Sequence, residues 1–422
     1  MIGIDICNIS RFSNMKNIDK FLDRYFTYDE TNYILNTGNR DETIAGIFSL
    51  KEAFVKAIGT GFGSVSPIDV EIIHNFSGKP DLIIHNEIVK KIEGISCSVS
   101  HDGDYAIAVV EVKLLNVKYE NIDVYEIKKL MPSRNKDGHK GDFGKVGIIG
   151  GSIGMSGSVD LCAKSSLRTG SGLVYNICPK SISDILEVKA IENIILPISD
   201  DNKGCFTLKY IDEILYKISN LDAIAIGCGL GRNKENLQLL EIIFKTYKKP
   251  IVIDADAIFF LKDIDFDIIN RNNIIITPHE AEFSRFSSYD LNEIKVNRED
   301  CVNKFYKNNT NFTLVLKGKN TIVKSSEEMF INQTGNSGMA TAGSGDCLTG
   351  IILSFLGQGL DTFASAKLGV FLHGLSGDFA EEEIGEDSLV ASDIIKYLPK
   401  AIKFIRKWYY VWKSIINFCG FR

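Results

Sequence analysis

The segment GMATAGSGDCLTG, residues 338–350, places one carboxylate, Asp346, inside a run of glycine and other small residues. Gly343 and Gly345 leave backbone N–H groups free at the N-terminus of an expected helix, a place that suits phosphate oxygens. A carboxylate beside them can accept a proton from a substrate hydroxyl, and it can equally cap the helix. The segment therefore predicts either a phosphate-binding helix with an adjacent base or a capped helix without chemistry.

Short apolar runs with many β-branched residues precede this segment, and each ends in Gly, Asp or Pro. Such runs are typical of strands that are buried on both faces of a largely parallel sheet. Because ligands bind at the carboxyl ends of parallel strands, the residues at those ends are expected to line a site. The runs are KVGIIGGS (145–152), GLVYNIC (172–178), DAIAIGCG (222–229), PIVIDADA (250–257), NIIITPHE (273–280) and TLVLKGKNTIV (313–323).

The composition fits an ordinary globular chain of 422 residues, 45% of them hydrophobic and 24% charged, with a formal net charge of -6. This balance argues against bulk binding to nucleic acid or to an anionic membrane surface. The nine cysteines include no C-x-x-C pair, so neither a disulfide framework nor a zinc site is indicated, and a reducing cytoplasm is expected. The start, MIGIDICNIS, lacks a basic export signal, and no run approaches about 18 uninterrupted apolar residues.

Glycine-rich loops are few in the first part of the chain and frequent in the second, and a polar, charged segment separates the two parts. We therefore expect a first domain at 1–118, a linker at 119–130, a second domain at 131–405 and a tail at 406–422. The tail contains both tryptophans of the chain on an apolar stripe. This stripe predicts packing on the protein, an oligomer contact or a weak association with a membrane surface.

Four segments of the first domain stand out together: IGIDI (2–6), FSLKEAFVKAIGTGFG (48–63), SGKP (77–80) and SCSVSHDGDYAIAVV (96–110). Their combination resembles the holo-acyl-carrier-protein synthase family of phosphopantetheinyl transferases over nearly all of residues 1–115. The resemblance implies an α+β fold, with coenzyme A and an acyl carrier protein as substrates. Taken alone, Glu52 and Lys56 stand four residues apart and would form an ordinary solvated ion pair.

In that family a magnesium ion is held by the Asp of the first strand and the Glu of the K-E-A helix, which match Asp5 and Glu52. Mg²⁺ prefers a few carboxylates together with phosphate oxygens, so it would bridge the coenzyme A pyrophosphate while a carrier serine attacks. The resemblance makes Lys56 a catalytic residue that neutralises charge on the phosphates. It also places His101 near the metal and the nucleotide, although a lone His after a strand is more often structural.

The turn Gly78-Lys79-Pro80 resembles the turn by which the family contacts its nucleotide. The carrier partner is expected to be a small acidic helical protein. It would dock on the basic residues between Arg11 and Arg24, because opposite charges steer association. A merely solvated helix explains the same charges equally well.

A second set of segments follows from residue 139 onward: HKGDFGKVGIIGGS, SGSVDLCAKSSLRTGSGLV, AIGCGLGR, VIDADAI, ITPHEAEFSRF, LVLKGKNTIV, GNSGMATAGSGDCLTGIILSFLGQG and LHGLSGD. Together they resemble the ADP/ATP-dependent NAD(P)H-hydrate dehydratase family, a branch of the ribokinase-like fold, from about residue 125 to 402. The resemblance implies a three-layer α/β/α fold with a mostly parallel sheet. The chain has no G-x-x-x-x-G-K-[ST] segment, which disfavours a Walker ATPase.

That family phosphorylates the hydroxyl of hydrated NAD(P)H with ADP or ATP, so that phosphate can leave and NAD(P)H is restored. The resemblance makes Asp346 the base. It assigns nucleotide binding to Lys317, Gly318, Lys319, Asn320, Thr321 and Gly345, and contacts with the hydrated dinucleotide to Ser158, Gly229, His279 and Asp346. Taken singly, Gly229 has an ordinary explanation as a turn glycine, and His279 has one as a loop cap. Asp254 and Asp256 of the DADA segment can have a structural role or can assist magnesium binding, and both alternatives stay open.

The two resemblances predict a bifunctional, homo-oligomeric, cytoplasmic enzyme with no membrane span and no nucleic-acid partner. Two alternatives stay open. The second domain can be a kinase of the same fold for another small alcohol, and the first can be a former transferase that serves as a carrier-binding or oligomerisation module. The segments HKGDFGKV and TPHEAEF favour the dehydratase, and the intact Asp5, Glu52 and Lys56 favour the transferase.

Overall fold

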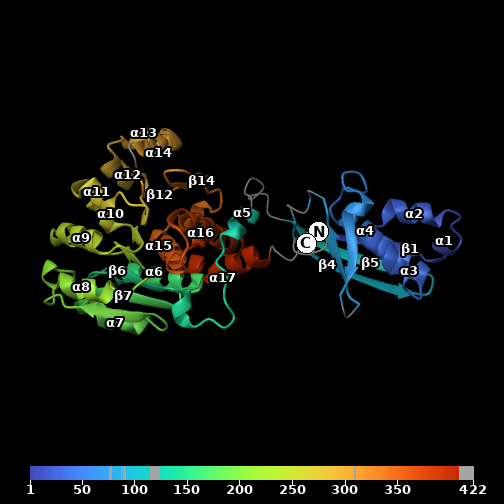
Figure 1. The fold of residues 1–422 in the computed structure, drawn as a ribbon, viewed down its shortest axis with the longest axis horizontal. Helices are drawn as coiled ribbons and strands as arrows, with labels where there is room; N and C mark the ends of the chain where they lie inside the picture. The colour runs from blue at the N-terminus through green and yellow to red at the C-terminus, as the bar shows by residue number, and fades with distance from the viewer. Residues whose placement is uncertain (76–77, 87, 89–91, 115–123, 308–309, 408–422) are drawn as a thin grey trace. The chain divides into compact units, whose positions relative to one another are not determined.

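The computed structural model describes residues 1–75, 78–86, 88, 92–114, 124–307 and 310–407 (Figure 1). These residues fall into two compact units, unit 1 within Met1–Ile122 and unit 2 across Asp123–Arg406. Residues 119–123 of the expected linker lie outside the described residues, and Val124–Lys129 form helix α5. Residues 408–422, most of the expected tail, lie outside them as well.

Unit 1 combines strands and helices, as expected for an α+β fold. Its strands are β1 (Ile2–Asn8), β2 (Val70–His74), β3 (Pro80–Ile84), β4 (Ile92–Asp102) and β5 (Tyr105–Leu114), and its helices are α1 (Ser10–Ser13), α2 (Ile18–Tyr25), α3 (Tyr28–Leu35) and α4 (Arg40–Ala57). Strands β1, β5 and β4 form an antiparallel sheet in that order, and β2 and β3 form a separate hairpin.

Helix α4 covers one face of the three-stranded sheet, and the sequence shows why. The residues of β5 alternate between buried and exposed, and Ala106, Ala108 and Val110 belong to the buried row that shares a core with α4. At Gly3 a Cβ atom would lie 2.0 Å from the carbonyl oxygen of Ala53, so only glycine lets the helix approach β1 this closely. The close approach brings the K-E-A part of α4 beside the first strand.

Unit 2 is built on a nine-stranded sheet in the order β14-β13-β12-β11-β10-β9-β6-β7-β8. Its strands are β6 (Lys145–Ile149), β7 (Leu173–Pro179), β8 (Ile194–Ile198), β9 (Ala223–Ile226), β10 (Ile251–Ile253), β11 (Ile274–Ile276), β12 (Thr313–Leu316), β13 (Ile322–Lys324) and β14 (Met329–Ile331). The neighbours from β12 to β8 are parallel, whereas β13 and β14 pair antiparallel at one edge.

Helices cover both faces of this sheet (Figure 1). In β10, Ile251 and Ile253 pack into one core with α8, α9, α12 and α14, and Val252 packs into the other with α6, α15 and α16. The expected three-layer α/β/α arrangement is confirmed. The helices of unit 2 are α5, α6 (Ser156–Thr169), α7 (Ser183–Lys189), α8 (Ile211–Ile218), α9 (Glu235–Thr246), α10 (Asp256–Phe259), α11 (Phe266–Ile269), α12 (Glu280–Ser287), α13 (Leu291–Val296), α14 (Arg298–Tyr306), α15 (Ser344–Gly357), α16 (Thr362–Ile384) and α17 (Ala391–Lys407).

All six apolar runs named from the sequence contain strands, but one of them is not a single strand. The run TLVLKGKNTIV folds back on itself and contains β12 and β13, which pair antiparallel. The reason is the turn between them, where Gly318 has φ +139° and Asn320 has φ +55°. Positive φ values are rare outside glycine and asparagine, and they end an extended strand.

Candidate active sites

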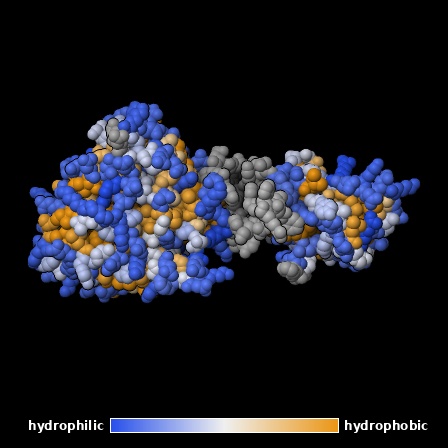
Figure 2. Space-filling model, in the orientation of Figure 1, coloured by the Kyte–Doolittle hydropathy of each residue, from blue (hydrophilic) through white to orange (hydrophobic). Residues whose placement is uncertain are grey.

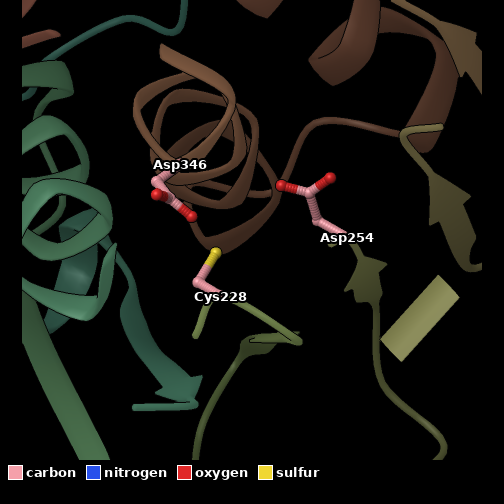
Figure 3. A group of neighbouring side chains, drawn as sticks. All are labelled: Cys228, Asp254 and Asp346. Atoms are coloured by element: carbon pink, nitrogen blue, oxygen red, sulfur yellow. The ribbon is translucent and has the colours of Figure 1, made fainter. Parts of the chain in front are cut away.

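In unit 2, side chains from two strand-ending loops and one helix meet at the carboxyl edge of the sheet, where Figure 3 shows them pointing toward one another. Cys228 follows β9, Asp254 follows β10, and Asp346 lies in the first turn of α15. The Cys228 sulfur and a carboxylate oxygen of each aspartate all lie within 4.8 Å of one another. Because β9 and β10 are parallel neighbours, both loops emerge beside the same helix end, as expected for a ligand site in such a sheet.

Asp254 forms an ion pair with Lys317, the first residue after β12. The Lys317 Nζ lies 2.7 Å from Asp254 Oδ1, and the Thr349 hydroxyl of α15 donates to Asp254 Oδ2 at 2.6 Å. The side chain of Asp254 is 1% exposed and that of Lys317 is 19% exposed. Burial disfavours the charged form of Asp254, but the Lys317 ammonium and the hydroxyls of Thr349 and Thr277 outweigh it and lower the pKa of Asp254.

This pairing bears on the open question of a metal at Asp254. The cluster of Cys228, Asp254 and Asp346 has three possible ligand atoms close together. Both oxygens of Asp254, however, already accept hydrogen bonds, one of them from an ammonium group. We therefore assign no metal to this cluster. Asp256 has a structural role, because its carboxylate accepts from the backbone N–H of Gly231 at 2.9 Å and pairs with Arg232.

The carboxyl group of Asp346 has a proton affinity that suits a general base. Its burial and, next, the negative charge of Asp254 raise the pKa of Asp346 to about 6. Hydrogen bonds from Cys228 and Ser158 and the charge of Lys317 act in the opposite direction. A carboxyl group with this pKa is mostly ionised at neutral pH and still binds a proton well, which is the compromise that proton transfer requires.

The N-terminus of α15 offers backbone N–H groups and one ammonium group to an anion. Its N-cap residue, Gly343, has φ +89°, and a Cβ atom there would lie 2.4 Å from Leu161 Cδ1. A Cβ atom at Gly345 would lie 3.5 Å from the Lys317 Nζ, so the ammonium lies beside the first turn of the helix. Partial positive charge at a helix N-terminus and a neighbouring ammonium both favour phosphate oxygens.

Ser158 and Gly229, two of the residues expected to contact substrate, lie beside Asp346. Ser158 acts on the pKa of Asp346 through a hydrogen bond. A Cβ atom at Gly229 would lie 3.3 Å from Ser158 Cβ and 2.7 Å from the carbonyl oxygen of Met155, and Gly229 has φ +62°. Glycine is therefore required at this position by both space and backbone conformation.

The nucleotide-binding segment expected at Lys317 to Thr321 is the turn between β12 and β13. Its lysine points to Asp254, and Gly318, Lys319 and Asn320 continue the turn. The hydroxyl of Thr321 donates to the carbonyl oxygen of Gly318 at 2.9 Å and closes it. The segment is thus a short, internally bonded turn whose first residue alone reaches the Asp346 cluster in the contacts that the structure shows.

Arg298, at the start of α14, braces this turn. Its guanidinium group donates to the carbonyl oxygens of Leu316 at 2.9 Å, Lys317 at 3.1 Å and also Lys319. A Cβ atom at Gly318 would lie 3.1 Å from Arg298 Nη2, so the glycine makes room for the arginine. A surface cavity of about 460 Å³ lies beside this turn and is lined by Lys295, Val296, Asn297, Arg298, Glu299, Asp300, Lys319, Asn320 and Ile322.

His279 caps helix α12. Its Nδ1 accepts from the backbone N–H groups of Ala281 at 3.2 Å and Glu282 at 3.3 Å, and its Nε2 lies 3.4 Å from Glu282 Oε1. The side chain is 55% exposed. The capping role foreseen as the ordinary explanation is therefore present, and a contact with substrate stays a prediction.

In unit 1, Asp5 of β1 lies close to two charged residues of α4. The Lys56 Nζ lies 2.6 Å from Asp5 Oδ1, so the ion pair that Lys56 forms is with Asp5 and not with Glu52 four residues before it. Burial and, next, the negative charge of Asp5 raise the pKa of Glu52, while Lys56 and Arg11 oppose that shift. The two expected metal ligands and the expected catalytic lysine thus form one cluster.

Lys51, the first residue of the K-E-A motif, belongs to the core. Its side chain is 0% exposed, and its Nζ donates to Glu30 Oε2 at 2.6 Å and to the carbonyl oxygen of Pro67 at 3.0 Å. The other oxygen of Glu30 accepts from the backbone N–H of Ile72 at 2.7 Å. The motif therefore combines a structural lysine with a glutamate that faces the candidate site.

His101 lies at the end of β4, against the first half of α4. Its Nδ1 lies 3.6 Å from Glu42 Oε1, and a Cβ atom at Gly46 would lie 2.9 Å from its Nε2. These contacts explain the ring position without a ligand. A role near the metal and nucleotide stays a prediction.

The turn Gly78-Lys79-Pro80 leads into β3. The N–H of Gly78 donates to the Asn75 carbonyl at 2.9 Å, and the N–H of Lys79 donates to the Asn75 side chain at 3.0 Å. Gly78 has φ +79°, and Pro80 begins the strand. The contact of this turn with a nucleotide also stays a prediction.

The two arginines expected to dock a carrier are exposed but differ in their surroundings. Arg11 lies over the ring of Phe48, 5.8 Å from its centroid, and its charge acts on the pKa of Glu52. Arg24 lies over the ring of Tyr25 at 5.4 Å. Arg11 is therefore part of the surroundings of the candidate metal ligands, whereas Arg24 lies on the outer side of α2.

Three residues in or around the unit 2 site had no role expected from the sequence: Cys228, Arg298 and His373. His373 of α16 is partly buried, its Nε2 lies 3.0 Å from the carbonyl oxygen of Ser344, and desolvation lowers its pKa to about 4. It is thus a neutral donor that supports the first turn of α15. The position of Cys228 directly after a predicted strand could have marked it as a site residue. No neighbouring residues in the sequence mark Arg298 or His373, because the groups that they contact are distant in sequence. None of the described helices is long and apolar enough to cross a membrane.

Comparisons with known proteins agree with this architecture. A family model described as NAD(P)H-hydrate dehydratase matches residues 146–400, and a model of the 4'-phosphopantetheinyl transferase superfamily matches residues 1–110. The bifunctional NAD(P)H-hydrate repair enzyme Nnr of Moorella thermoacetica is 34% identical over 276 residues, which are 65% of this chain and 52% of that relative. The ADP-dependent (S)-NAD(P)H-hydrate dehydratase of Neisseria meningitidis serogroup B is 35% identical over 263 residues, which are 60% of this chain and 82% of the relative.

Among solved structures, a ribokinase-like superfamily protein from Enterococcus faecalis matches with a TM-score of 0.58 and 25% identity, over 68% of this chain and 95% of that chain. Unit 2 therefore has the ribokinase-like fold. The chain belongs to the NAD(P)H-hydrate dehydratase family, and its first 110 residues match a second family of enzymes. The chain spans about half the length of the Moorella relative.

Proposed function

We propose that unit 2 converts the S form of hydrated NAD(P)H to NAD(P)H in two steps, phosphoryl transfer from ADP or ATP and then elimination of phosphate. The observation that carries this proposal is the Asp346 carboxylate, with a pKa of about 6, at the N-terminus of α15 beside the Lys317 ammonium. A base and an anion site must be adjacent because the hydroxyl loses its proton as it attacks phosphorus. Family membership and the Neisseria relative support the choice of substrate.

In the first step, the hydroxyl oxygen of the hydrate forms a bond to the terminal phosphorus of the nucleotide. The bond from that phosphorus to its bridging oxygen breaks, which leaves AMP from ADP or ADP from ATP. Asp346 takes the hydroxyl proton, and the N–H groups of α15 together with Lys317 stabilise the charge on the transferred group. In the second step the C–O bond breaks, phosphate leaves with the bonding electrons, the ring loses a proton, and the double bond is restored.

For unit 1 we propose the transfer of 4'-phosphopantetheine from coenzyme A to a serine of an acyl carrier protein. The serine oxygen gives up its proton to the solvent and forms a bond to the phosphorus next to the pantetheine. The bond from that phosphorus to the bridging oxygen breaks, and adenosine 3',5'-bisphosphate leaves with the bonding electrons. The match of residues 1–110 to the transferase superfamily supports this activity. Lys56 would neutralise charge on the phosphates, and its side chain is 50% exposed, so it can leave Asp5 and reach them.

Asp5 and Glu52 fit a magnesium ion. Both are carboxylates, and the effect of Asp5 on the pKa of Glu52 shows that they repel each other, which a divalent cation would relieve. When bound, the ion would neutralise pyrophosphate charge. The protein's own contribution is to hold the two carboxylates on β1 and α4, which Gly3 keeps in close contact.

We infer that an acidic carrier protein docks on the exposed basic residues of α1 and α2, including Arg11 and Arg24. Homo-oligomerisation is supported by the outer face of the unit 1 sheet, and Figure 2 shows hydrophobic residues at the surface of this unit. Exposed apolar patches commonly mark interfaces between proteins. The outer face exposes Ile2, Ile4, Ile6, Ile107 and Val109. Both proposed activities use metabolites of the cytoplasm, and we place the enzyme there.

One purified chain of residues 1–422 tests both activities. With hydrated NADH and ADP or ATP, we expect the NADH absorbance to recover. With apo acyl carrier protein, coenzyme A and magnesium, we expect the mass of the carrier to rise by one phosphopantetheine. A stable phosphate ester without NADH would show a kinase of the same fold, and an unmodified carrier that still binds would show a docking module in unit 1.

A further inference from the structure

We propose that Asp254 is a positioning residue that holds the Lys317 ammonium beside the first turn of α15, where the phosphate of the nucleotide binds. The inference rests on the dehydratase function proposed for unit 2 and assigns a role in it to a residue that touches no substrate. Asp254 reaches Lys317 at 2.7 Å and Thr349 at 2.6 Å, so it connects the end of β12 to the helix that carries the base.

The backbone around this pair is fixed, but the lysine side chain is not fixed by itself. The N–H of Lys317 donates to the carbonyl oxygen of Pro278 at 2.8 Å. At Gly227, a Cβ atom would lie 1.8 Å from the carbonyl oxygen of Asp254, so the loops after β9 and β10 are in direct backbone contact. A lysine side chain has four rotatable bonds, and its ammonium group takes the position of whichever acceptor holds it.

A second carboxylate competes for the same ammonium group. Glu282 of α12 is buried and also attracts Lys317 electrostatically. Its own oxygens face His279, with the His279 N–H at 2.9 Å from Oε2. When the charge of Asp254 is removed, Glu282 and Asp346 both still attract Lys317, but the direct contact at 2.7 Å is lost. Asp254 therefore fixes the position of the ammonium group.

The same carboxylate acts on the base. The titratable and charged groups that face Asp346 come from every element around it: Asp254 after β10, Lys317 after β12, Cys228 after β9, Cys162 of α6 and Cys347 of α15, and the Ser158 hydroxyl also meets it. Among the charged groups, Asp254 is the one that raises the pKa of Asp346. Its removal lowers that pKa, so the base becomes ionised at lower pH.

The test uses the full chain with Asp254→Asn, which keeps size and removes charge. Asp256→Asn is the matched control, because Asp256 lies two residues further on, at the start of α10, and bonds to Gly231 and Arg232 instead. For Asp254→Asn we expect weaker ADP binding by calorimetry and a fall in kcat/KM on the order of 10²-fold, the size expected when a catalytic group is misplaced. The acid limb of the pH–rate profile, near pH 6 in the parent, should move to lower pH.

Asp254→Glu should recover part of the ADP affinity, because it returns the charge. If Asp254→Asn does not fold, Thr349→Val removes only the hydrogen bond to Oδ2 and should raise the KM for the nucleotide several-fold. Unchanged ADP affinity with an unmoved acid limb in a folded Asp254→Asn variant would overturn the inference. If the parent chain repairs no hydrate at all, the proposed function fails, and ADP binding by the two variants still decides the role of Asp254.

Discussion

The two candidate sites share one chemical pair, a lysine bonded to an aspartate, in different surroundings. Lys56 lies 2.6 Å from Asp5 with side chains 50% and 12% exposed, and Lys317 lies 2.7 Å from Asp254 with side chains 19% and 1% exposed. Exposed pairs contribute about 0–1 kcal/mol, whereas removing one partner of a buried pair costs about 3–5 kcal/mol. The two distances are similar, but the roles differ: Lys56 is free to move to a phosphate, and Lys317 is held in place.

The position of each aspartate in its sheet explains the difference. Asp5 lies on β1, an edge strand of a three-stranded sheet, and the side chain of its partner Lys56 is 50% exposed. Asp254 follows β10, which lies in the interior of a nine-stranded sheet between β9 and β11 and is covered by α15. Burial therefore fixes the positions of Asp254 and Lys317 in unit 2 before any ligand binds. In unit 1, the positions of the Asp5 and Lys56 side chains depend on the ligands that bind there.

The strongest way to separate the two sites is Asp346→Asn. The amide cannot accept a proton at neutral pH, and loss of a general base costs on the order of 10²–10⁴ in rate. We expect hydrate repair to fall by that factor in a steady-state assay. ADP binding and carrier modification by the same chain should persist. Repair at the parental rate would show that Asp346 only stabilises the helix and that the proposed mechanism is wrong.

Glu52→Gln should have the opposite effect, with loss of carrier modification and retention of hydrate repair. Loss of one of two carboxylates should weaken magnesium binding and reduce carrier modification by roughly 10–100-fold or more, measured by the mass of the carrier over a range of magnesium concentrations. Hydrate repair should stay within a few-fold of the parent, because Glu52 lies in the other unit. If the variant modifies the carrier at the parental rate at low magnesium concentration, Glu52 is not a magnesium ligand.

Truncation of the two lysines sharpens the comparison energetically. Lys317→Ala leaves Asp254 buried and unpaired, and we expect unit 2 to lose about 3–5 kcal/mol of stability. Lys56→Ala should change unit 1 by about 0–1 kcal/mol. Urea unfolding of the full chain, followed by hydrogen exchange so that each unit is observed separately, measures both. Similar losses in the two variants would show that burial does not distinguish the pairs.

Arg298→Lys tests a smaller, indirect effect. A lysine ammonium is a compact group without the planar fork of the guanidinium, so it cannot span the three carbonyl groups that Arg298 reaches, and the turn after Lys317 should loosen. We expect the KM for ADP or ATP to rise about 5- to 30-fold, equivalent to roughly 1–2 kcal/mol. The value of kcat should change less, because the cluster around Asp346 is intact. A fall in kcat at unchanged KM would place Arg298 in the chemistry rather than in the support of the turn.

Local signals in the sequence predicted the strands of unit 2, the glycine-rich start of α15 and the carboxylate within it. Local reasoning could not find the partners of the lysines. Four-residue spacing paired Lys56 with Glu52, but its partner, Asp5, is 51 residues away, and Asp254 is 63 residues from Lys317. The run from Thr313 to Val323 looked like one strand because its apolar ends hide a turn set by two positive φ values. Ion pairs between residues so far apart in the sequence follow from the order of the strands in the sheet. That order could not be predicted from local patterns in the sequence.

Unit 1 cannot complete its core until the chain has been synthesised past Ile72. Glu30 of α3 and Lys51 of α4 leave the ribosome earlier, but the acceptor at Pro67 and the donor at Ile72 that complete their bonding come later. A buried ion pair whose remaining donors and acceptors are unmet costs several kcal/mol. The two helices must therefore keep these charges hydrated while the nascent chain grows. The core itself is completed later still, because Ala106, Ala108 and Val110 of β5 belong to it and β5 is the strand that pairs with β1.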